Sequence, residues 1–125
     1  MQGGLNSLFM QSSSSSFVVV SGRSNAPLAE AIAGHLNARL VPVSIGEYPS
    51  GETHVQVLES VRNKSVILVQ SAQQINSLLS GPSPNDLLME TIMLVDACRR
   101  AGGNKIILVL PSLPYTEEEE DFDEN

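Results

Sequence analysis

The run SVILVQS at residues 65–71 constrains the fold more than any other stretch, because it is apolar almost throughout. A strand with one face in water alternates apolar and polar residues, whereas a strand without alternation is covered on both faces. We therefore expect 65–71 to be a central strand of a sheet with helices on both faces. The β-branched run FVVVS at 17–21 predicts another buried strand, and KIILVLP at 105–111 predicts the last one.

A first helix is predicted after Gly22, where the strand 17–21 ends. Ser24 or Asn25 can cap this helix, and Pro27 suits its first turn. Apolar residues then recur at helical spacing over about three turns. The predicted stripe is Leu28, Ile32 and Leu36.

The second predicted helix has clearer ends. Ser83 and Asp86 match the S-x-x-D capping box, and Pro84 occupies the first helical position. Gly102 and Gly103 end the helix, as glycine commonly does just past a last turn. Its predicted stripe is Leu88, Ile92 and Val95.

Two further strands complete the pattern. In RLVPV at 39–43, Pro42 predicts an edge position or an early end. THVQV at 53–57 alternates, with Val55 and Val57 on one face, so it is predicted to be half exposed. The order of strand, helix, three strands, helix and strand indicates an α/β fold, with a mixed or mostly parallel sheet and helices on its faces.

Charge is concentrated in one part of the sequence. Residues 117–124 hold seven of the fourteen acidic residues, and the other seven balance the seven lysines and arginines. We expect 116–125 to be a disordered acidic tail and the Ser-rich 1–16 to be a disordered leader, which leaves 17–115 as the folded domain. No basic patch favours nucleic-acid binding, and no apolar run reaches the roughly 18 residues of a membrane span.

The chain has one cysteine and two histidines. A single cysteine excludes a disulfide framework and fits a reducing compartment such as the cytoplasm. A structural zinc site needs more ligands of this kind, so no metal site is expected. Cys98, His35 and His54 are interpreted as packing or solvated residues rather than as a nucleophile, a base or a ligand. No catalytic residue is assigned.

Two loops are candidates for binding. SGRSNAP at 21–27 joins a strand to a helix and could hold a phosphate on backbone N–H groups. It lacks the further glycines of a dinucleotide fingerprint and the Gly-Lys-Ser/Thr of a P-loop, so a structural turn is favoured. The loop at 47–53 suits a purine base, because Tyr48 can stack on it and Glu52 can accept a hydrogen bond from an amino group.

From Val19 to Tyr115 the sequence resembles the N-terminal domain of ribose-phosphate diphosphokinases, the phosphoribosyl pyrophosphate (PRPP) synthetases. Residues around 74–83 look like an insertion relative to that family. The resemblance implies a fold like one half of a phosphoribosyltransferase-like protein, and a part in converting ATP and ribose 5-phosphate to PRPP and AMP with Mg²⁺. The matching segments, in the family's order and near its spacing, are SGRSNAPLAEAIAGHL, YPSGETHVQVLESVRNKSVILVQS, NDLLMETIMLVDACRRAGGNKIILVLP and PSLPY.

The resemblance also implies two sites. In the family, the loop that matches 48–52 contacts the adenine of ATP from a neighbouring subunit, which assigns this contact to Tyr48, Ser50 and Glu52. Tyr48 keeps the aromatic ring and Glu52 is intact, but Ser50 replaces the usual Asn or Asp. Ser60 and Arg62 fall where the family binds a regulatory phosphate or ADP, and a hydroxyl with a guanidinium suits that chemistry. The alternative is that Arg62 is only solvated at the end of a strand.

The sequence departs from the family after PSLPY. Thr116 and the acidic run stand where the family has an Ala-Arg-Gln-Asp-type motif that contacts ATP, and the family's magnesium ligand, catalytic loop and ribose 5-phosphate loop find no match. We expect a truncated N-terminal domain that is inactive alone and forms homo-oligomers, or hetero-oligomers with full-length synthetase subunits. The alternative is a non-catalytic regulatory subunit or an interaction protein associated with PRPP synthetase.

Overall fold

The computed structural model describes residues 16–71 and 81–111. The expected leader apart from Ser16, most of the expected insertion at 74–83 and the whole expected acidic tail at 116–125 lie outside the described residues. The helices and strands are β1 (Phe17–Ser21), α2 (Ala26–Leu36), β2 (Arg39–Leu40), β3 (Val43–Glu47), β4 (Thr53–Val57), β5 (Ser65–Val69), α3 (Pro84–Arg100) and β6 (Lys105–Val109).

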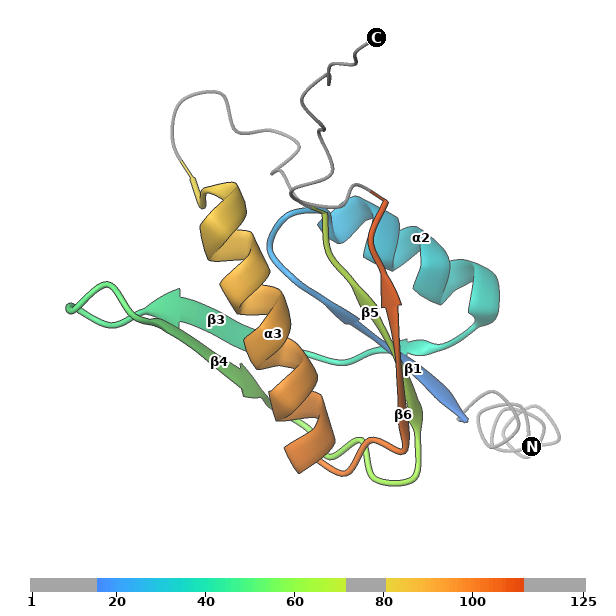
Figure 1. Ribbon diagram of the computed structural model, residues 1–125. Helices are drawn as coiled ribbons and strands as arrows, with labels where there is room; N and C mark the ends of the chain where they lie inside the picture. The colour runs from blue at the N-terminus through green and yellow to red at the C-terminus, as the bar shows by residue number, and fades with distance from the viewer. Residues whose placement is uncertain (1–15, 72–80, 112–125) are drawn as a thin grey trace, which may run out of the picture.

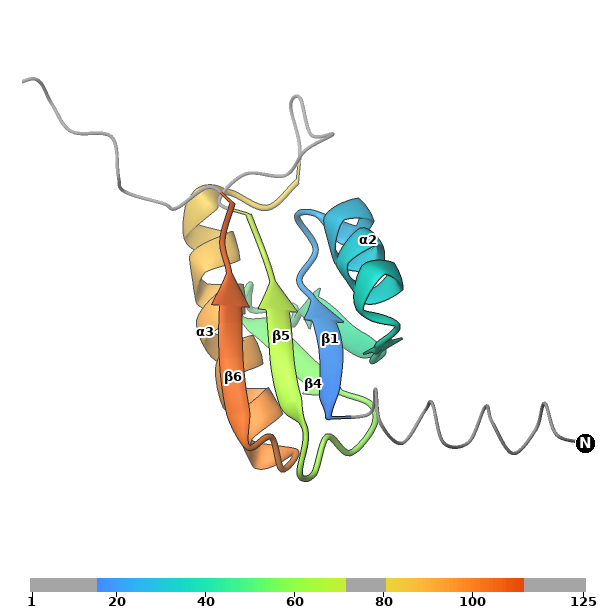
Figure 2. The ribbon, with the colours of Figure 1, turned by 90° about the vertical axis from the view of Figure 1, so that its right-hand side faces the viewer.

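Four strands form a parallel sheet in the order β2-β1-β5-β6. The helix α2 joins β1 to β2, and α3 joins β5 to β6. The strands β1 and β5 therefore lie at the centre of the sheet, and β2 and β6 lie at its two edges. Figure 1 shows the sheet between α2 and α3, and Figure 2 shows β6 at the edge away from α2. The expected fold class is confirmed, and β5 is the central strand that its apolar run predicts.

The predicted strand at 39–43 is wrong in part. Pairing with β1 covers only Arg39 and Leu40, and β2 is an edge strand that ends early, as Pro42 predicts. Proline has no N–H to donate, so the ladder stops there. The chain then leaves the sheet and forms β3, which pairs with β4 in an antiparallel hairpin that sequence analysis did not predict.

The sheet residues alternate between two apolar clusters, one on each face. Val18, Val20, Val66 and Leu68 lie on the face that packs against Leu94 and Cys98 of α3. The opposite face packs against α2, and its cluster consists of Val19, Ile67, Val69, Ala29 and Ala33. The hairpin lies beside α3 on the same side of the sheet (Figure 2), where Val55 and Val57 pack against the first cluster as predicted, together with Val43 and Ile45. The helix α3 therefore contacts both the sheet and the hairpin.

The capping box of α3 is confirmed, but its predicted apolar stripe is displaced. Ser83 and Asp86 exchange their hydrogen bonds, at 3.1 Å and 3.0 Å. The predicted stripe of Leu88, Ile92 and Val95 lies at the margin of the packed face, and Ile92 is 54% exposed. The helix buries a different face against the sheet and the hairpin. This face includes the polar residues Glu90 and Thr91, so a search for apolar residues at helical spacing does not find it. The buried residues are Leu87, Glu90, Thr91, Leu94, Ala97 and Cys98.

In α2 the cap is Asn25, whose side chain accepts a hydrogen bond from the backbone N–H of Leu28 at 3.2 Å. The predicted stripe is correct only in part. Leu28 and Ile32 pack at the edge of the cluster, while Leu36 is 48% exposed. The small residues Ala29 and Ala33 are the buried ones. They let the helix lie close to β1, which bulky residues at the same positions would prevent.

Candidate functional site

The loop predicted to bind a purine is the tip of the β3–β4 hairpin. Two backbone hydrogen bonds close it, from the N–H of Gly51 to the carbonyl of Tyr48 and from the N–H of Tyr48 to the carbonyl of Glu52, each at 2.8 Å. Pro49 occupies the position where a β-turn favours proline, and Gly51 adopts φ +92°, a conformation open mainly to glycine. This sequence therefore specifies a tight turn, which Figure 1 shows projecting away from the sheet.

The structure brings Tyr48, Ser50 and Glu52 together on this exposed turn. Tyr48 is 54% exposed, and Ser50 and Glu52 are exposed as well. The Ser50 hydroxyl accepts a long hydrogen bond from the backbone N–H of Glu52, at 3.4 Å. Among the described residues the Glu52 carboxylate makes no ion pair, so it is available as an acceptor. Ring, hydroxyl and carboxylate are thus all exposed on one short turn.

His54 contacts the turn, although sequence analysis assigned it only a solvated position. Its ring centroid lies 4.9 Å from that of Tyr48, and the two ring planes are inclined by 30°. Such a distance and tilt are within the usual range for packed aromatic rings. The signal that could have identified it was the hairpin, because pairing Gly46 with His54 places the imidazole beside the turn.

Ser60 and Arg62 lie in a second exposed turn, between β4 and β5. The Ser60 hydroxyl accepts a hydrogen bond from the backbone N–H of Arg62 at 3.2 Å, and both residues are exposed. Val61 between them is fully buried and donates to the carbonyl of Ala101 at 3.1 Å. A Cβ on Gly102 would lie 2.8 Å from the Cα of Arg62, so the close approach requires glycine there.

A polar cluster at the carboxyl ends of β1 and β5 was not predicted. Glu90 of α3 is fully buried and accepts hydrogen bonds from the Arg23 backbone N–H at 2.8 Å, from Arg23 Nε at 2.6 Å and from Gln70 Nε2 at 2.8 Å. The side-chain oxygen Oε1 of Gln70 accepts a hydrogen bond from the backbone N–H of Ser24 at 3.1 Å and another from the Ser24 hydroxyl. The only local signal was an acidic residue within the apolar part of a helix.

This cluster bears on the two interpretations of the segment 21–27. The backbone N–H groups of Arg23 and Ser24, which a phosphate would need, already donate to Glu90 and Gln70. Gly22 packs so closely on Gln70 that a Cβ would collide with its side chain. These contacts favour the interpretation as a structural turn.

Cys98 is fully buried, and burial raises the pKa of its thiol to about 11. The thiol therefore stays protonated at neutral pH. Only the thiolate is a good nucleophile, so Cys98 is a poor one. The interpretation of Cys98 as a packing residue is confirmed. His35, by contrast, is exposed on the last turn of α2.

Known proteins share this sequence and arrangement. The family model for the N-terminal domain of ribose phosphate pyrophosphokinase matches residues 17–124. The chain belongs to the ribose-phosphate pyrophosphokinase family. The match supports the resemblance drawn from the segments around the hairpin, and it assigns this chain to the N-terminal part of the family's architecture.

Curated relatives in this family are substantially longer. The chain is 36% identical over 101 residues to ribose-phosphate pyrophosphokinase from Thermotoga maritima, covering 81% of this chain and 30% of the relative. It is 41% identical over 98 residues to the chloroplastic ribose-phosphate pyrophosphokinase 2 of Oryza sativa, covering 78% of this chain and 22% of the relative. The chain thus spans about a third or less of the family members that it matches.

Two crystal structures resemble this ribose-phosphate pyrophosphokinase domain. Phosphoribosylpyrophosphate synthetase from Mycobacterium smegmatis matches with a TM-score of 0.65 and 29% identity, over 79% of this chain and 30% of that one. Purine phosphoribosyltransferase from Pyrococcus horikoshii matches with a TM-score of 0.58 and 11% identity, over 90% of this chain and 71% of that one. The second likeness concerns the fold alone, and it agrees with the expected phosphoribosyltransferase-like half.

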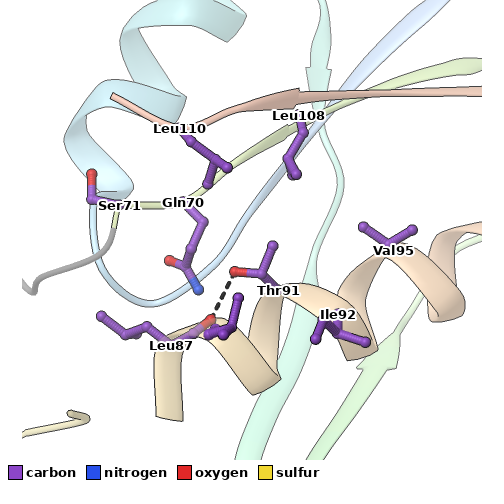
Figure 3. A pocket seen from close by; sticks show the side chains of 9 residues that line it. Gln70, Ser71, Leu87, Thr91, Ile92, Val95, Leu108 and Leu110 are labelled. Carbon is purple, nitrogen blue, oxygen red and sulfur yellow. Dashed lines mark hydrogen bonds between the residues drawn. The ribbon is translucent and has the colours of Figure 1, made fainter. Parts of the chain in front are cut away.

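An apolar groove of about 250 Å³ lies between α3 and the sheet edge of this domain. Figure 3 shows Leu108 and Leu110 facing Ile92 and Val95 across it, with the Thr91 hydroxyl donating to the carbonyl of Leu87 at 2.7 Å. The displaced stripe of α3 therefore lines a groove.

No helix among residues 16–71 and 81–111 is long and apolar enough to span a membrane. The same residues contain no group of three or more His, Cys, Asp or Glu side chains that could hold a metal ion.

Proposed function

We propose that this domain supplies the adenine-contacting hairpin of a ribose-phosphate pyrophosphokinase, the enzyme that transfers the diphosphoryl group of Mg-ATP to the C1 hydroxyl of ribose 5-phosphate. The observation that carries the proposal is the exposed turn at the hairpin tip. It carries the Tyr48 ring, the Ser50 hydroxyl and the Glu52 carboxylate within five residues, and all three residues are exposed.

Each of the three residues has a distinct role in this proposal. The Tyr48 ring stacks on the adenine, because an exposed aromatic face attracts a flat base. The Glu52 carboxylate accepts a hydrogen bond from the exocyclic amino group of adenine, which distinguishes adenine from guanine. The Ser50 hydroxyl can donate or accept, but its reach is shorter than that of the Asn or Asp usual in the family.

The shape of the domain supports contact with a nucleotide in a neighbouring subunit. The carboxyl ends of β1, β5 and β6 lie together at one end of the sheet, whereas the hairpin tip projects to the side of the domain (Figure 1). A nucleotide placed at the carboxyl edge of its own sheet would lie away from this tip. The tip is better placed to reach across an interface.

Magnesium enters this proposal only as the companion of ATP. The described residues contain no group of three or more His, Cys, Asp or Glu side chains that could hold a metal ion, and this proposal assigns them no Mg²⁺ ligand. In this proposal the magnesium ligands and the ribose 5-phosphate site come from other parts of the assembled enzyme. This domain contributes base recognition.

The proposal is tested by titrating the chain with ATP and recording NMR spectra. We expect shifts at residues 48–54, with Tyr48→Ala and Glu52→Gln weakening the apparent affinity several-fold. Glu30→Gln, on the exposed side of α2, is the matched control for loss of a carboxylate and should leave the affinity unchanged. Tripolyphosphate, which has no base, should not shift these residues. Equal shifts with tripolyphosphate and ATP would contradict base recognition.

A second role, regulation, is favoured by a specific sequence observation. Thr116 and the acidic run stand where the family has the Arg and Gln that contact ATP. A chain with this substitution can dock on catalytic subunits and offer its hairpin without completing a site of its own. Mixing the chain with an active full-length relative distinguishes the two roles. A change in the relative's KM for ATP supports regulation, while unchanged kinetics despite co-sedimentation contradict it.

A further inference from the structure

His54 is assigned no role by the family resemblance, yet it is the described residue whose ring packs against the candidate adenine-stacking ring. The two ring centroids are 4.9 Å apart, with the planes inclined by 30°. His54 is half-buried, while Tyr48 is 54% exposed. One side of the tyrosine ring is therefore engaged by the imidazole, and the ring still offers a large area to solvent.

The hairpin places His54 there through its alternation and register. Val55 and Val57 face α3, so His54 projects from the opposite face of β4. Its cross-strand partner is Gly46, which has no side chain to occupy that face. A Cβ on Gly46 would come within 3.3 Å of His54 Nε2, so glycine gives the imidazole room to lie over β3. Tyr48 begins the turn directly beyond β3.

We propose that His54 is a positioning residue for the adenine contact: its imidazole supports one face of the Tyr48 ring, so that the other face is presented to the base. This inference deepens the proposed function and depends on it. The physical reason is that a tyrosine on an exposed turn samples several rotamers, and binding a base would then have to select one of them. A ring already held by a neighbour loses less freedom when the base stacks.

The size of the effect follows from the strength of such ring pairs. Removing the imidazole should weaken binding of ATP by roughly 2- to 10-fold, the range that aromatic pair energies imply. A flat ring at position 54 should preserve binding, whereas a polar side chain without a ring should not. The response to tripolyphosphate, which has no base, should be the same with and without the imidazole.

The test uses NMR on the whole 125-residue chain. Cross-peaks between the His54 and Tyr48 rings report the packing, and titrations with ATP and tripolyphosphate report binding. We expect His54→Ala and His54→Gln to weaken the ATP-dependent shift of the Tyr48 ring by that factor and His54→Phe to retain it. His35→Ala on α2 is the matched histidine control. Amide exchange at Tyr48, whose N–H closes the turn at 2.8 Å, reports whether the hairpin remains folded in each variant.

The outcomes separate this inference from the proposed function. If the parent chain binds ATP through Tyr48 and His54→Ala binds it equally well with the turn intact, the positioning role is wrong and the proposed function stands. If His54→Phe loses as much affinity as His54→Ala, ring packing is not the cause, and the inference again fails. If ATP never shifts Tyr48 while the ring cross-peaks persist, the proposed function fails, and the role of His54 toward adenine fails with it.

Discussion

Glu90 is the residue at which the turn after β1, the end of β5 and the helix α3 meet. A buried carboxylate is costly unless it is paired and hydrogen-bonded, and here Arg23 and Gln70 supply three donors within 2.8 Å. The same contacts fix the backbone of Arg23 and Ser24 at the start of α2. One side chain of α3 thus orients the first βα junction.

We predict that Glu90→Ala lowers the free energy of unfolding by about 3 kcal/mol, because it leaves a buried amide and part of a guanidinium without an acceptor. Glu90→Gln should cost less, since an amide oxygen replaces some of the acceptor capacity. Urea unfolding measures both, with Glu30→Ala on the exposed face of α2 as a control within about 0.5 kcal/mol of the parent. Equal effects of Glu90→Ala and the control would refute this account.

Arg62 carries the second prediction at this scale. If Ser60 and Arg62 form an oxyanion site, inorganic phosphate should shift amides at 60–63 and at the neighbouring 101–103, and Arg62→Ala should abolish the shifts. Arg100→Ala is the control, because Arg100 is also exposed and pairs with Asp96 at 2.9 Å. Shifts scattered over the surface, or unchanged in Arg62→Ala, would show that Arg62 is only solvated.

At the scale of elements, the two ends of α3 determine how the layers meet. Its first turn is held by the reciprocal hydrogen bonds of Ser83 and Asp86. Its last turn is followed by Gly102 at φ +104°, where the chain passes close to the 60–64 turn. Because α3 contacts the sheet and the hairpin, a frayed end would disturb both.

We predict that Ser83→Ala destabilises the domain by about 0.5–2 kcal/mol, the usual effect of losing a cap. The hydrogen bond from the Ser83 backbone, followed by that from its side chain, lowers the pKa of Asp86 below its ordinary 3.8. A lowered pKa stabilises the fold above pH 3.8 and loses that contribution as the pH falls through the lower folded-state value. Unfolding at pH 7 and pH 3 should therefore differ less in Asp86→Asn than in the parent. An equal difference between the two pH values in Asp86→Asn and the parent would contradict the assignment.

At the scale of the whole molecule, an apolar groove lies at one edge of the sheet. Among residues 16–71 and 81–111 the strand β6 pairs only with β5, Leu108 is 41% exposed, and the groove beside it is lined by apolar residues of α3. An unpaired strand edge with apolar side chains favours association with another chain. The family's longer members carry further sequence that this chain does not span.

We predict that the purified chain self-associates or binds a full-length relative, and that Leu108→Lys reduces this association. Leu36→Lys on α2 is the matched control, because Leu36 is similarly exposed at 48% but lies outside the groove. Sedimentation velocity of each variant, alone and mixed with the relative, measures the effect. A parent chain that remains monomeric and ignores the relative at micromolar concentration would leave the partner proposal without support.

These 125 residues by themselves are predicted to produce no PRPP from Mg-ATP and ribose 5-phosphate. The reason is that the described residues contain no group of three or more His, Cys, Asp or Glu side chains that could hold a metal ion, and acidic residues stand where the family places Arg and Gln beside ATP. Like charges would repel the phosphates in the step that most needs positive charge. Turnover above a no-enzyme blank, in a preparation free of host synthetase, would contradict this expectation.

Sequence alone determined the features that depend on neighbours a few positions apart. The capping box at Ser83, the early end of a strand at Pro42 and the turn at Gly51 are set by local backbone chemistry, which the residue types report directly. The run at 65–71, which is apolar almost throughout, likewise predicted a central strand. The three side chains of the hairpin tip were assigned as a set by the family resemblance, and their positions within five residues explain why one turn carries them all.

Only the tertiary structure decided which surfaces meet. Val43–Glu47 became a strand because β4 pairs with it, and α3 buries the face of Glu90 because the sheet and the hairpin pack against that side. The contact of Arg23 with Glu90 joins residues 67 positions apart, and the packing of His54 on Tyr48 depends on hairpin register. Such contacts arise when several elements pack together at once. A local sequence pattern does not predict them, because the two partners come together only in the folded structure.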